Sequence, residues 1–257
     1  MNIRDARHVL VTGAAGAIGQ AIALEIADLC GARLTLVDKD RAGVEALAAR
    51  IGAKARAVAW DLARPEALAA AYEDATRDEA CDVLVNCAGI MELRSFAGTP
   101  WSLGQLLLDV DLVSPLRLMS LAVPRMREER RGIVVNVSSM AGLVPLRGSA
   151  YYGAAKAGLA MASEIARIEL APDVQVLTVY PGPVASGLER RARAQVPATW
   201  ISRAMPTGDP AELASRVMRA IDAGSARVIY PPLYAGAAEV LAVARRVTER
   251  FSPAPLE

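Results

Sequence analysis

The chain has 257 residues, of which 53% are hydrophobic, and its formal net charge at pH 7 is +1. This length suits one large domain with a substantial core, and the apolar share excludes an intrinsically disordered protein. The balanced charge excludes a strongly basic nucleic-acid binder, and no apolar run reaches the roughly 18 residues that would span a membrane.

The cysteines and the histidine give no sign of a metal site. Cys30, Cys81 and Cys87 are odd in number and do not follow a metal-ligand spacing, so they predict a reduced, cytoplasmic chain. The single histidine, His8, stands just before an apolar run, where a strand-edge residue is expected more than a catalyst or a ligand. The first apolar run is too short for a secretory signal.

Short apolar runs alternate with longer segments of helical periodicity along the chain. The runs that predict strands are 9–11, 34–37, 57–60, 83–85, 133–137, 174–179 and 228–230. The segments that predict helices are 18–29, 41–50, 65–79, 103–130, 154–170 and 210–223. Continuous apolar strands that alternate with helices are typical of a parallel sheet with helices on both faces.

Two stretches interrupt this alternation. Residues 90–101 predict a polar loop after the fourth strand, and residues 182–208 predict a longer substrate loop after the sixth. Both leave the carboxyl edge of the sheet, where α/β proteins bind ligands, so we expect them to frame a site. Residues 233–251 predict a C-terminal helix that covers this site, contacts a second subunit or touches a membrane surface. Because no linker interrupts the chain, residues 1–257 are expected to form a single domain.

The junction between the first strand and the first helix is rich in glycine. It reads Thr12-Gly13-Ala14-Ala15-Gly16-Ala17-Ile18-Gly19. Glycines permit a tight turn and a close approach to a pyrophosphate, and the following helix offers free N–H groups. The spacing departs from G-x-G-x-x-G, so taken alone the motif also fits a flexible turn.

The ends of the next strands strengthen the prediction of a dinucleotide site. Asp38 ends the second strand, where a carboxylate can accept both ribose hydroxyls and would repel a 2′-phosphate. Because Ala15 leaves the glycine-rich loop without a basic side chain, the pattern predicts NAD rather than NADP, although Lys39 and Arg41 stand close to Asp38 and weaken that preference. Asp61 and Leu62 are expected beside the adenine. The turn-forming stretch of Asn86, Cys87, Ala88 and Gly89 is expected to let the cofactor lie flat across the strand ends.

Tyr152 and Lys156 are the candidate catalytic pair, since a spacing of four residues places them on one face of a helix. A tyrosine pKa lies near 10, and a neighbouring ammonium group lowers it towards the operating pH of a general acid/base. Tyr-x-x-x-Lys is common by chance, but Ser139 ends the fifth strand and can hold a substrate oxygen against Tyr152. Tyr151 is the rival tyrosine, and it has no lysine four residues further on.

These motifs together resemble those of the short-chain dehydrogenase/reductase family over nearly the whole chain. They are Thr12-Gly13…Ile18-Gly19, Asp61, Asn86…Ala88-Gly89, Ser139, Tyr152-x-x-x-Lys156 and Tyr180-Pro181-Gly182-Pro183-Val184. The resemblance implies a Rossmann-type, doubly wound sheet of seven parallel strands in the order 3-2-1-4-5-6-7. It also implies metal-free hydride transfer between NAD(H) and a secondary alcohol or ketone, and a homodimer or homotetramer.

The resemblance further implies roles for individual residues. Tyr152 would be the general acid/base, Lys156 would lower the tyrosine pKa and bind the nicotinamide ribose, and Ser139 would orient the substrate. The implied cofactor-binding residues are Gly13, Ala15, Ile18, Gly19, Asp38, Asp61, Leu62, Asn86, Ala88, Gly89, Tyr152, Lys156, Pro181, Val184 and Ser186.

The chain departs from the family pattern at four positions. Ala17 replaces a frequent glycine, Cys87 replaces an asparagine and Ser186 replaces a threonine. Asp111 stands where the family has its fourth catalytic residue, an asparagine. Aspartate adds a charge and loses two donors, so it can pair with Lys156 and weaken its effect, stay protonated, or act through its backbone.

Three functions therefore compete. The first is an active alcohol dehydrogenase or ketone reductase, the second is an NAD-binding pseudoenzyme, and the third is a related dehydratase or epimerase. Apolar residues near Ser139 and in the substrate loop favour a hydrophobic alcohol or ketone, or simply pack the loop. They are Met140, Leu143, Val144, Pro145, Leu146, Leu188, Val196, Trp200, Ile201 and Met205.

Overall fold

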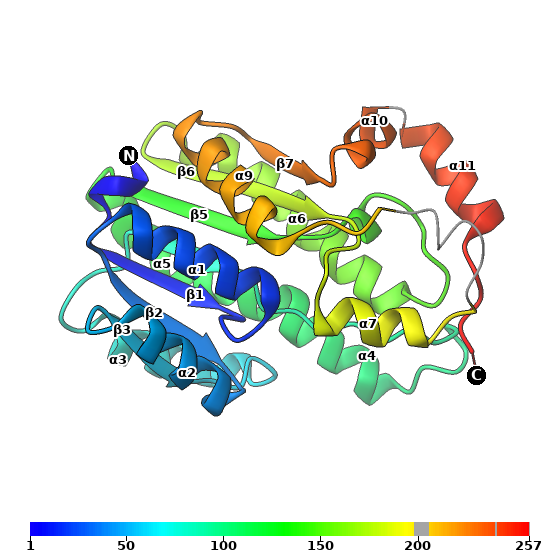
Figure 1. Ribbon diagram of the computed structural model, residues 1–257, viewed down its shortest axis with the longest axis horizontal. Coiled ribbons are helices and arrows are strands. Elements are labelled where there is room, and N and C mark those ends of the chain that lie inside the picture. Colours follow the sequence, from blue (N-terminus) through cyan, green and yellow to red (C-terminus); the bar gives the residue numbers. More distant parts are fainter. Residues whose placement is uncertain (198–205, 240, 257) are drawn as a thin grey trace.

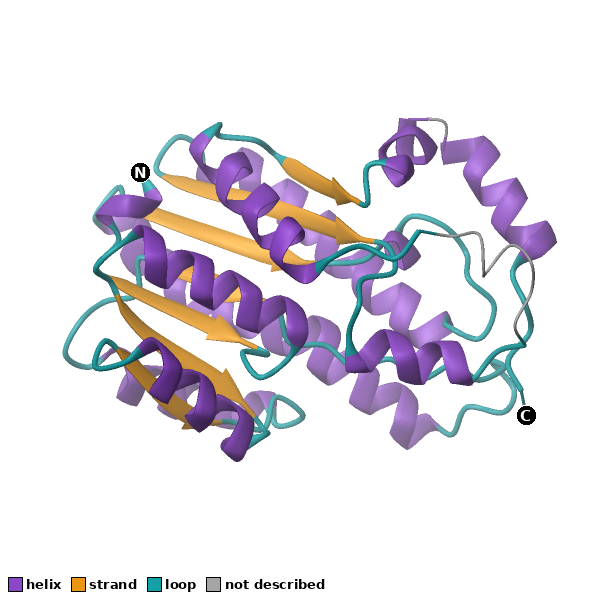
Figure 2. Ribbon diagram, viewed as in Figure 1, coloured by secondary structure: helices purple, strands orange, loops and turns teal. Residues whose placement is uncertain are grey.

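The computed structural model describes residues 1–197, 206–239 and 241–256, and it contains one sheet of seven parallel strands. The strand order, β3-β2-β1-β4-β5-β6-β7, is the predicted one (Figures 1 and 2). The strands are β1 His8–Thr12, β2 Arg33–Asp38, β3 Ala55–Ala59, β4 Val83–Asn86, β5 Gly132–Val137, β6 Val174–Pro181 and β7 Arg227–Tyr230. The order reverses between β1 and β4, which is where doubly wound sheets bind ligands.

Helices cover both faces of the sheet (Figure 1). They are α1 Ala17–Leu29, α2 Arg41–Ile51, α3 Leu68–Thr76, α4 Trp101–Leu108, α5 Ser114–Glu128, α6 Ala150–Leu170, α7 Gly187–Ala194, α9 Pro210–Asp222, α10 Leu233–Glu239 and α11 Leu241–Phe251. There are also short 3-10 turns, η1 Ile3–Asp5, η2 Pro65–Ala67 and η4 Met140–Gly142. Side chains that alternate along each strand pack into the two layers. In β1, Val9 and Val11 join the core under α1, α2 and α9, whereas Leu10 joins the core under α3 and α5.

Local signals in the sequence explain where several helices begin and end. Asp209 accepts hydrogen bonds from the backbone N–H groups of Ala211 and Glu212, and Pro210 occupies the first turn of α9. An aspartate at the N-cap and a proline in the first turn are both preferred at the start of a helix. Asp40 caps α2 through the N–H of Gly43. Gly52, with φ of +93°, ends α2 in a conformation that favours glycine.

Several predicted boundaries shift by a few residues, and two elements differ in ways that bear on the fold. The third strand was predicted over 57–60 but spans Ala55–Ala59, so Trp60 follows the strand and packs into the core beneath it. The predicted helix over 103–130 is instead α4 and α5 joined by a π-helical turn, η3 Asp109–Val113, in which the N–H of Ser114 reaches the carbonyl of Asp109. Such widened turns are rare and frequently lie at functional sites.

The two segments expected to frame the site lie beyond the carboxyl ends of the strands (Figure 1). The predicted loop over 182–208 contains a helix, α7, because the Ser186 hydroxyl accepts from the N–H of Glu189 and caps it. Its basic residues Arg190 and Arg191 are exposed. Trp200, Ile201 and Met205 lie outside the described residues. The predicted C-terminal helix over 233–251 is present as α10 and α11.

The tail after α11 packs back on its own chain. Ser252 Oγ accepts from the N–H of Arg147 at 3.0 Å, and the N–H of Leu256 donates to the carbonyl of Gln195 at 2.8 Å. The Gln195 side chain in turn accepts from the N–H of Leu93 at 2.8 Å. These contacts join the C-terminal tail to both loops beyond the strand ends.

Other polar features lie away from these strand ends. His8 begins β1 and is fully buried, with ring nitrogens 2.8 Å from the carbonyl of Glu79 and 2.9 Å from Thr35 Oγ1. Because both ring nitrogens have a hydrogen-bonding partner, His8 is a structural residue of the core.

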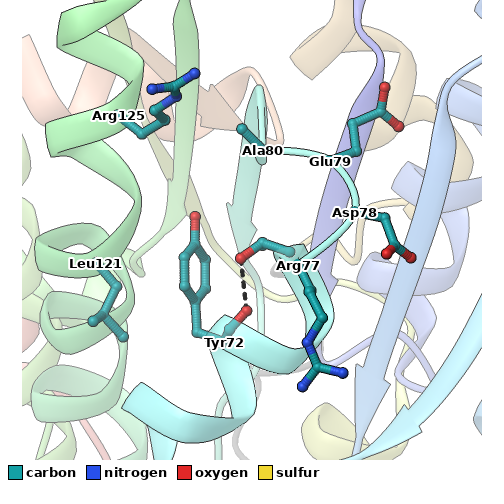
Figure 3. A pocket seen from close by; sticks show the side chains of 8 residues that line it. Tyr72, Arg77, Asp78, Glu79, Ala80, Leu121 and Arg125 are labelled. Carbon is teal, nitrogen blue, oxygen red and sulfur yellow. Dashed lines mark hydrogen bonds between the residues drawn. The ribbon is translucent and has the colours of Figure 1, made fainter.

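A cavity of 330 Å³ lies near the start of β4, lined by Tyr72, Thr76, Arg77, Asp78, Glu79, Ala80, Leu121 and Arg125 (Figure 3). Within the described residues, no helix combines the length and the hydropathy needed to cross a membrane.

Candidate active site

The glycine-rich turn is held against the end of β4. Thr12 Oγ1 accepts from the N–H groups of Cys87 at 3.1 Å and Ala88 at 3.3 Å, which ties β1 to β4. Gly13 has φ of +68°, and a Cβ on it would lie 2.6 Å from the backbone of Ala88. A Cβ on Gly19 would overlap the carbonyl of Gly13. The turn therefore requires glycine at both positions and keeps a bare backbone surface before α1.

The helix that follows this turn is open at its N-terminus. Gly16 precedes α1 and provides no side-chain cap, so the first N–H groups of α1 stay available to an anion. Ala17 begins the helix, where an alanine is readily accommodated. Ile18 is partly buried against the core. The glycine-rich segment thus has the form of a phosphate-binding cradle.

Asp38 faces the same turn from the end of β2. One carboxylate oxygen accepts from the N–H of Ala15 at 3.0 Å, and the other accepts from the N–H of Asp40 at 3.0 Å. The side chain is only partly buried. The carboxylate therefore fixes the turn and adds a negative charge beside it.

The predicted adenine and sheet residues occupy different environments. Asp61 is exposed and accepts from the N–H of Ala63 at 3.0 Å, two residues beyond the end of β3. Leu62 is buried, and its carbonyl accepts from Ser114 Oγ at 2.6 Å. Asn86 ends β4 with its side chain buried, and its amide donates to Asn136 Oδ1 at 2.8 Å. The Asn86 side chain therefore points into the sheet rather than towards the glycine-rich turn.

Ser139, Tyr152 and Lys156 come together at the ends of β5 and α6. Tyr152 is 6% exposed and Lys156 is 3% exposed, and the lysine Nζ lies 5.9 Å from the centre of the tyrosine ring. Ser139, just beyond β5, accepts from the N–H of Ala141 at 3.1 Å. Lys156 Nζ donates to the carbonyl of Val137 at 3.1 Å, and Ser138 Oγ donates to the carbonyl of Lys156 at 2.8 Å. The first turns of α6 are thereby fixed to β5.

The electrostatic environment of Tyr152 combines opposing effects. The pKa of Tyr152 lies above its ordinary value, contrary to the lowering expected from Lys156. Burial, the largest effect, raises it, the charge of Lys156 lowers it, the charge of Asp111 raises it, and a hydrogen bond with Ser139 lowers it. Asp111 is fully buried on η3, with Oδ1 3.1 Å from Lys156 Nζ. Of the alternatives for Asp111, the structure therefore adopts the pairing with Lys156. Burial raises the pKa of Asp111, and the charge of Lys156 opposes that rise.

The rival tyrosine lies elsewhere. Tyr151 is partly exposed and stacks on Phe96, with ring centres 5.8 Å apart, and its edge meets Trp101. It therefore contributes to an aromatic cluster on α4 and the preceding loop, whereas Tyr152 alone faces Lys156.

The remaining predicted residues line the start of the substrate loop. Pro181 ends β6, Val184 pairs with Gly208 in an isolated parallel bridge, and Ser186 caps α7. Two contributors were missed from the sequence, the Thr12 hydroxyl and Gln195. Thr12 was visible as a hydroxyl at a strand end, whereas Gln195 had no signal, because its partners Leu93 and Leu256 are remote in the chain.

Comparisons with known proteins place these features in one family. The family model described as short chain dehydrogenase matches residues 7–197. The chain is 33% identical to a 3-oxoacyl-(acyl-carrier-protein) reductase of Vibrio cholerae, covering 84% of this chain and 90% of that protein. It is 32% identical to estradiol 17-beta-dehydrogenase 2 of Mus musculus, covering 69% of this chain and 48% of that protein.

Among solved structures, a short-chain dehydrogenase from Sphingobium yanoikuyae in complex with NADPH matches with a TM-score of 0.80 and 28% identity, over 95% of this chain and 96% of that one. A 3-ketoacyl-(acyl-carrier-protein) reductase from Brucella melitensis with NADH has the same fold, with a TM-score of 0.76 at 24% identity, over 90% of this chain and 99% of that one. From the family match and these relatives, the chain belongs to the short-chain dehydrogenase/reductase family of oxidoreductases.

Proposed function

We propose that the protein transfers a hydride between NAD(H) and a hydrophobic secondary alcohol or ketone, with Tyr152 as the general acid/base. The observation that supports this most directly is the buried Tyr152 beside Lys156, with Ser139 at the adjacent strand end. These side chains lie at the carboxyl edge of a doubly wound sheet, next to a glycine-rich cradle.

The residues of the site divide the proton chemistry among them. In carbonyl reduction, the Tyr152 hydroxyl donates its proton to the substrate oxygen, and in alcohol oxidation the phenolate accepts that proton. The Ser139 hydroxyl donates a hydrogen bond to the same oxygen and orients it. A bound nicotinamide dinucleotide supplies or accepts the hydride. Lys156 holds its ammonium group beside the tyrosine, and it would also bind the nicotinamide ribose of a bound cofactor.

The cradle before α1 fits a dinucleotide, since Gly13 and Gly19 let the turn pack closely on its own backbone and the first N–H groups of α1 have no side-chain cap. We assign the pyrophosphate to Gly13, Ala15, Ile18 and Gly19, and the adenosine to Asp38, Asp61 and Leu62. Ala88 and Gly89 would line the middle of the cofactor, with Asn86 contributing through its backbone. Pro181, Val184 and Ser186 would face the nicotinamide.

The preference for NAD rests on Asp38. Its carboxylate stands next to Ala15, and the nearby Arg41 lies 3.5 Å from Glu45, so that its charge is partly balanced. The 2′-phosphate of NADP would be repelled by this carboxylate, which would weaken its binding relative to NAD. Relatives of both cofactor types exist, since one similar structure holds NADPH and another holds NADH.

Replacement of Asp38 by Asn is expected to shift the cofactor preference towards NADPH. The amide keeps one acceptor for a backbone N–H but removes the charge, and one like-charge contact is worth roughly tenfold to a hundredfold in relative affinity. Calorimetric titration of both proteins with NADH and NADPH measures the shift. Asp40→Asn is the matched control on the next turn. An unchanged ratio of the two affinities in Asp38→Asn would contradict the assignment.

The substrate is proposed to be hydrophobic because Met140 is buried beside the site and Leu143 packs against it. The names of two relatives, an oxoacyl reductase and an estradiol dehydrogenase, also indicate ketones or secondary alcohols on long apolar skeletons. The proposed location is the cytoplasm, which agrees with three free cysteines.

The test is an assay of NADH consumption against a panel of aliphatic, terpenoid and steroid ketones, with the alcohols assayed in reverse. Turnover of a panel member supports the proposal. If the wild-type protein binds the nucleotide but turns over no panel member, and Asp111→Asn gains activity, the second candidate, an NAD-binding pseudoenzyme, would be favoured. That candidate is kept because Asp111 pairs with Lys156. Conversion of substrate without net change in NADH would favour a dehydratase or epimerase.

The protein is also proposed to form a homodimer or homotetramer through the outer face of α6. Met161, Ile165 and Ile168 follow one another at helical spacing and are 61%, 47% and 68% exposed. Exposed apolar stripes of this kind mark interfaces between subunits, and two-fold assemblies are the commonest. On the neighbouring α4, Leu106 is 37% exposed.

Ile165→Arg is therefore expected to dissociate the protein into monomers, because an arginine would be buried without a partner at the interface. Sedimentation equilibrium measures the mass in solution. Ala46→Arg, at an exposed position on α2, serves as the control and leaves the assembly unchanged. An Ile165→Arg protein with the wild-type assembly mass would exclude this face.

A further inference from the structure

The ion pair between Asp111 and Lys156 is built into the site. The π-helical turn η3 directs Asp111 inwards, where its carboxylate is fully buried and lies 3.1 Å from Lys156 Nζ. The N–H of Ile90 also donates to this carboxylate, at 3.3 Å and 3.4 Å from its two oxygens. The carboxylate is therefore held in place by two separate elements.

Gly89 leaves the space that the pair occupies. A Cβ at this position would lie 2.8 Å from Asp111 Oδ1 and 3.3 Å from Lys156 Nζ. The absence of a side chain at Gly89 is thus matched to the pair. Lys156 Nζ also donates to the carbonyl of Val137 at 3.1 Å.

The pair changes the charge that Tyr152 experiences. A lone Lys156 would present a full positive charge to the phenol, whereas Asp111 and Lys156 together present a dipole with no net charge. The titratable groups around the pair are Tyr152 on α6 and the Cys87 thiol after β4. Burial raises the pKa of Cys87 to about 12, so this thiol brings no charge at neutral pH.

We propose that Asp111 is a positioning residue that neutralises Lys156 and so, together with the burial of the ring, keeps Tyr152 a proton donor at neutral pH and moves alcohol oxidation to higher pH. This inference rests on the proposed function, because it assumes that Tyr152 is the acid/base. It assigns the pH ranges of carbonyl reduction and alcohol oxidation to one buried carboxylate, while the equilibrium between alcohol and ketone is set by the substrate, the cofactor and the pH. Oxidation then requires a more alkaline solution, where the phenolate forms.

The first test needs neither cofactor nor substrate. Tyrosinate formation is followed by ultraviolet absorbance during a pH titration, and the Tyr152 contribution is the difference between each protein and its Tyr152→Phe counterpart. Asp111→Asn is expected to move the ionisation of Tyr152 downwards by roughly 1 to 2 pH units, because the charge of Lys156 is no longer balanced. The matched control, Asp109→Asn, removes the same charge from the same turn without touching Lys156 and leaves the ionisation in place.

The second test is the pH profile of turnover. In Asp111→Asn, the rise of alcohol oxidation with pH is expected at lower pH by the same shift, since the phenolate is the base. The fall of carbonyl reduction at high pH moves in the same direction, since the phenol is the acid. Asp111→Ser, which is smaller and also neutral, is the second variant should the amide prevent folding.

The inference would be overturned if a folded Asp111→Asn or Asp111→Ser protein showed the wild-type ionisation of Tyr152. A variant that lost only thermal stability would have the same meaning. Absence of turnover in the wild-type protein on every panel member would instead count against the proposed function, and the tyrosinate titration would still decide the role of Asp111. The two failures are therefore distinguishable.

Discussion

Tyr152→Phe is expected to lower turnover by roughly 10²–10⁴-fold, with a much smaller loss of affinity for the nucleotide. The substitution removes a single hydroxyl from a ring that is 6% exposed, so the packing around α6 and the distance to Lys156 are preserved. What is lost is the proton donor and acceptor at the substrate oxygen. Steady-state rates at saturating nucleotide, together with a calorimetric titration of nucleotide binding, measure the two effects separately.

Tyr151→Phe is the matched control for this experiment. It removes the same hydroxyl from the preceding residue, whose ring stacks on Phe96 away from Lys156. Its turnover should equal that of the wild type. Equal losses in Tyr151→Phe and Tyr152→Phe, or full activity in Tyr152→Phe, would be incompatible with Tyr152 as the acid/base.

Gly19→Ala is expected to abolish nucleotide binding and to destabilise the fold by about 1–3 kcal/mol. The added methyl group would overlap the carbonyl of Gly13, which is backbone and cannot rotate away as a side chain would. Relief requires the glycine-rich turn to move, and Gly13 is already confined between this position and Ala88. Urea denaturation and calorimetric titration with NADH report the two losses.

Gly31→Ala provides the comparison for that experiment. Gly31 lies between α1 and β2, and a Cβ there would meet no atom within 4 Å. It tests whether alanine at a neighbouring, unconstrained glycine is tolerated. Tight nucleotide binding by Gly19→Ala would show that the cradle does not depend on a bare backbone at this position.

Much of the fold was predictable because each central strand is a continuous apolar run. Strands such as Val83–Asn86 are buried on both faces of the sheet, and a run of this kind next to helical periodicity has few other interpretations. The edge strand Ala55–Ala59 carries partly exposed residues, so its apolar pattern is weaker and its prediction was displaced towards Trp60. The order of the strands came from the family resemblance.

The candidate site was predictable where chemistry is local and obscure where it depends on distant contacts. Tyr152 and Lys156 are four residues apart, so their common face follows from helical geometry. The π-helical turn at Asp109–Val113 has no sequence signature, and without it the pairing of Asp111 with Lys156 stayed one alternative among three. The helix α7 was not predicted, because its segment is rich in Arg, Pro and Gly and was interpreted as a loop. The contacts of Gln195 depend on tertiary packing, which the sequence does not show.

The central claim is that this chain binds a nicotinamide dinucleotide at its glycine-rich cradle, and calorimetric titration of the wild-type protein with NADH and NADPH tests it most directly. The account predicts saturable binding of NADH, weaker binding of NADPH because of Asp38, and loss of NADH binding in Gly19→Ala. A folded wild-type protein that binds neither nucleotide would contradict it.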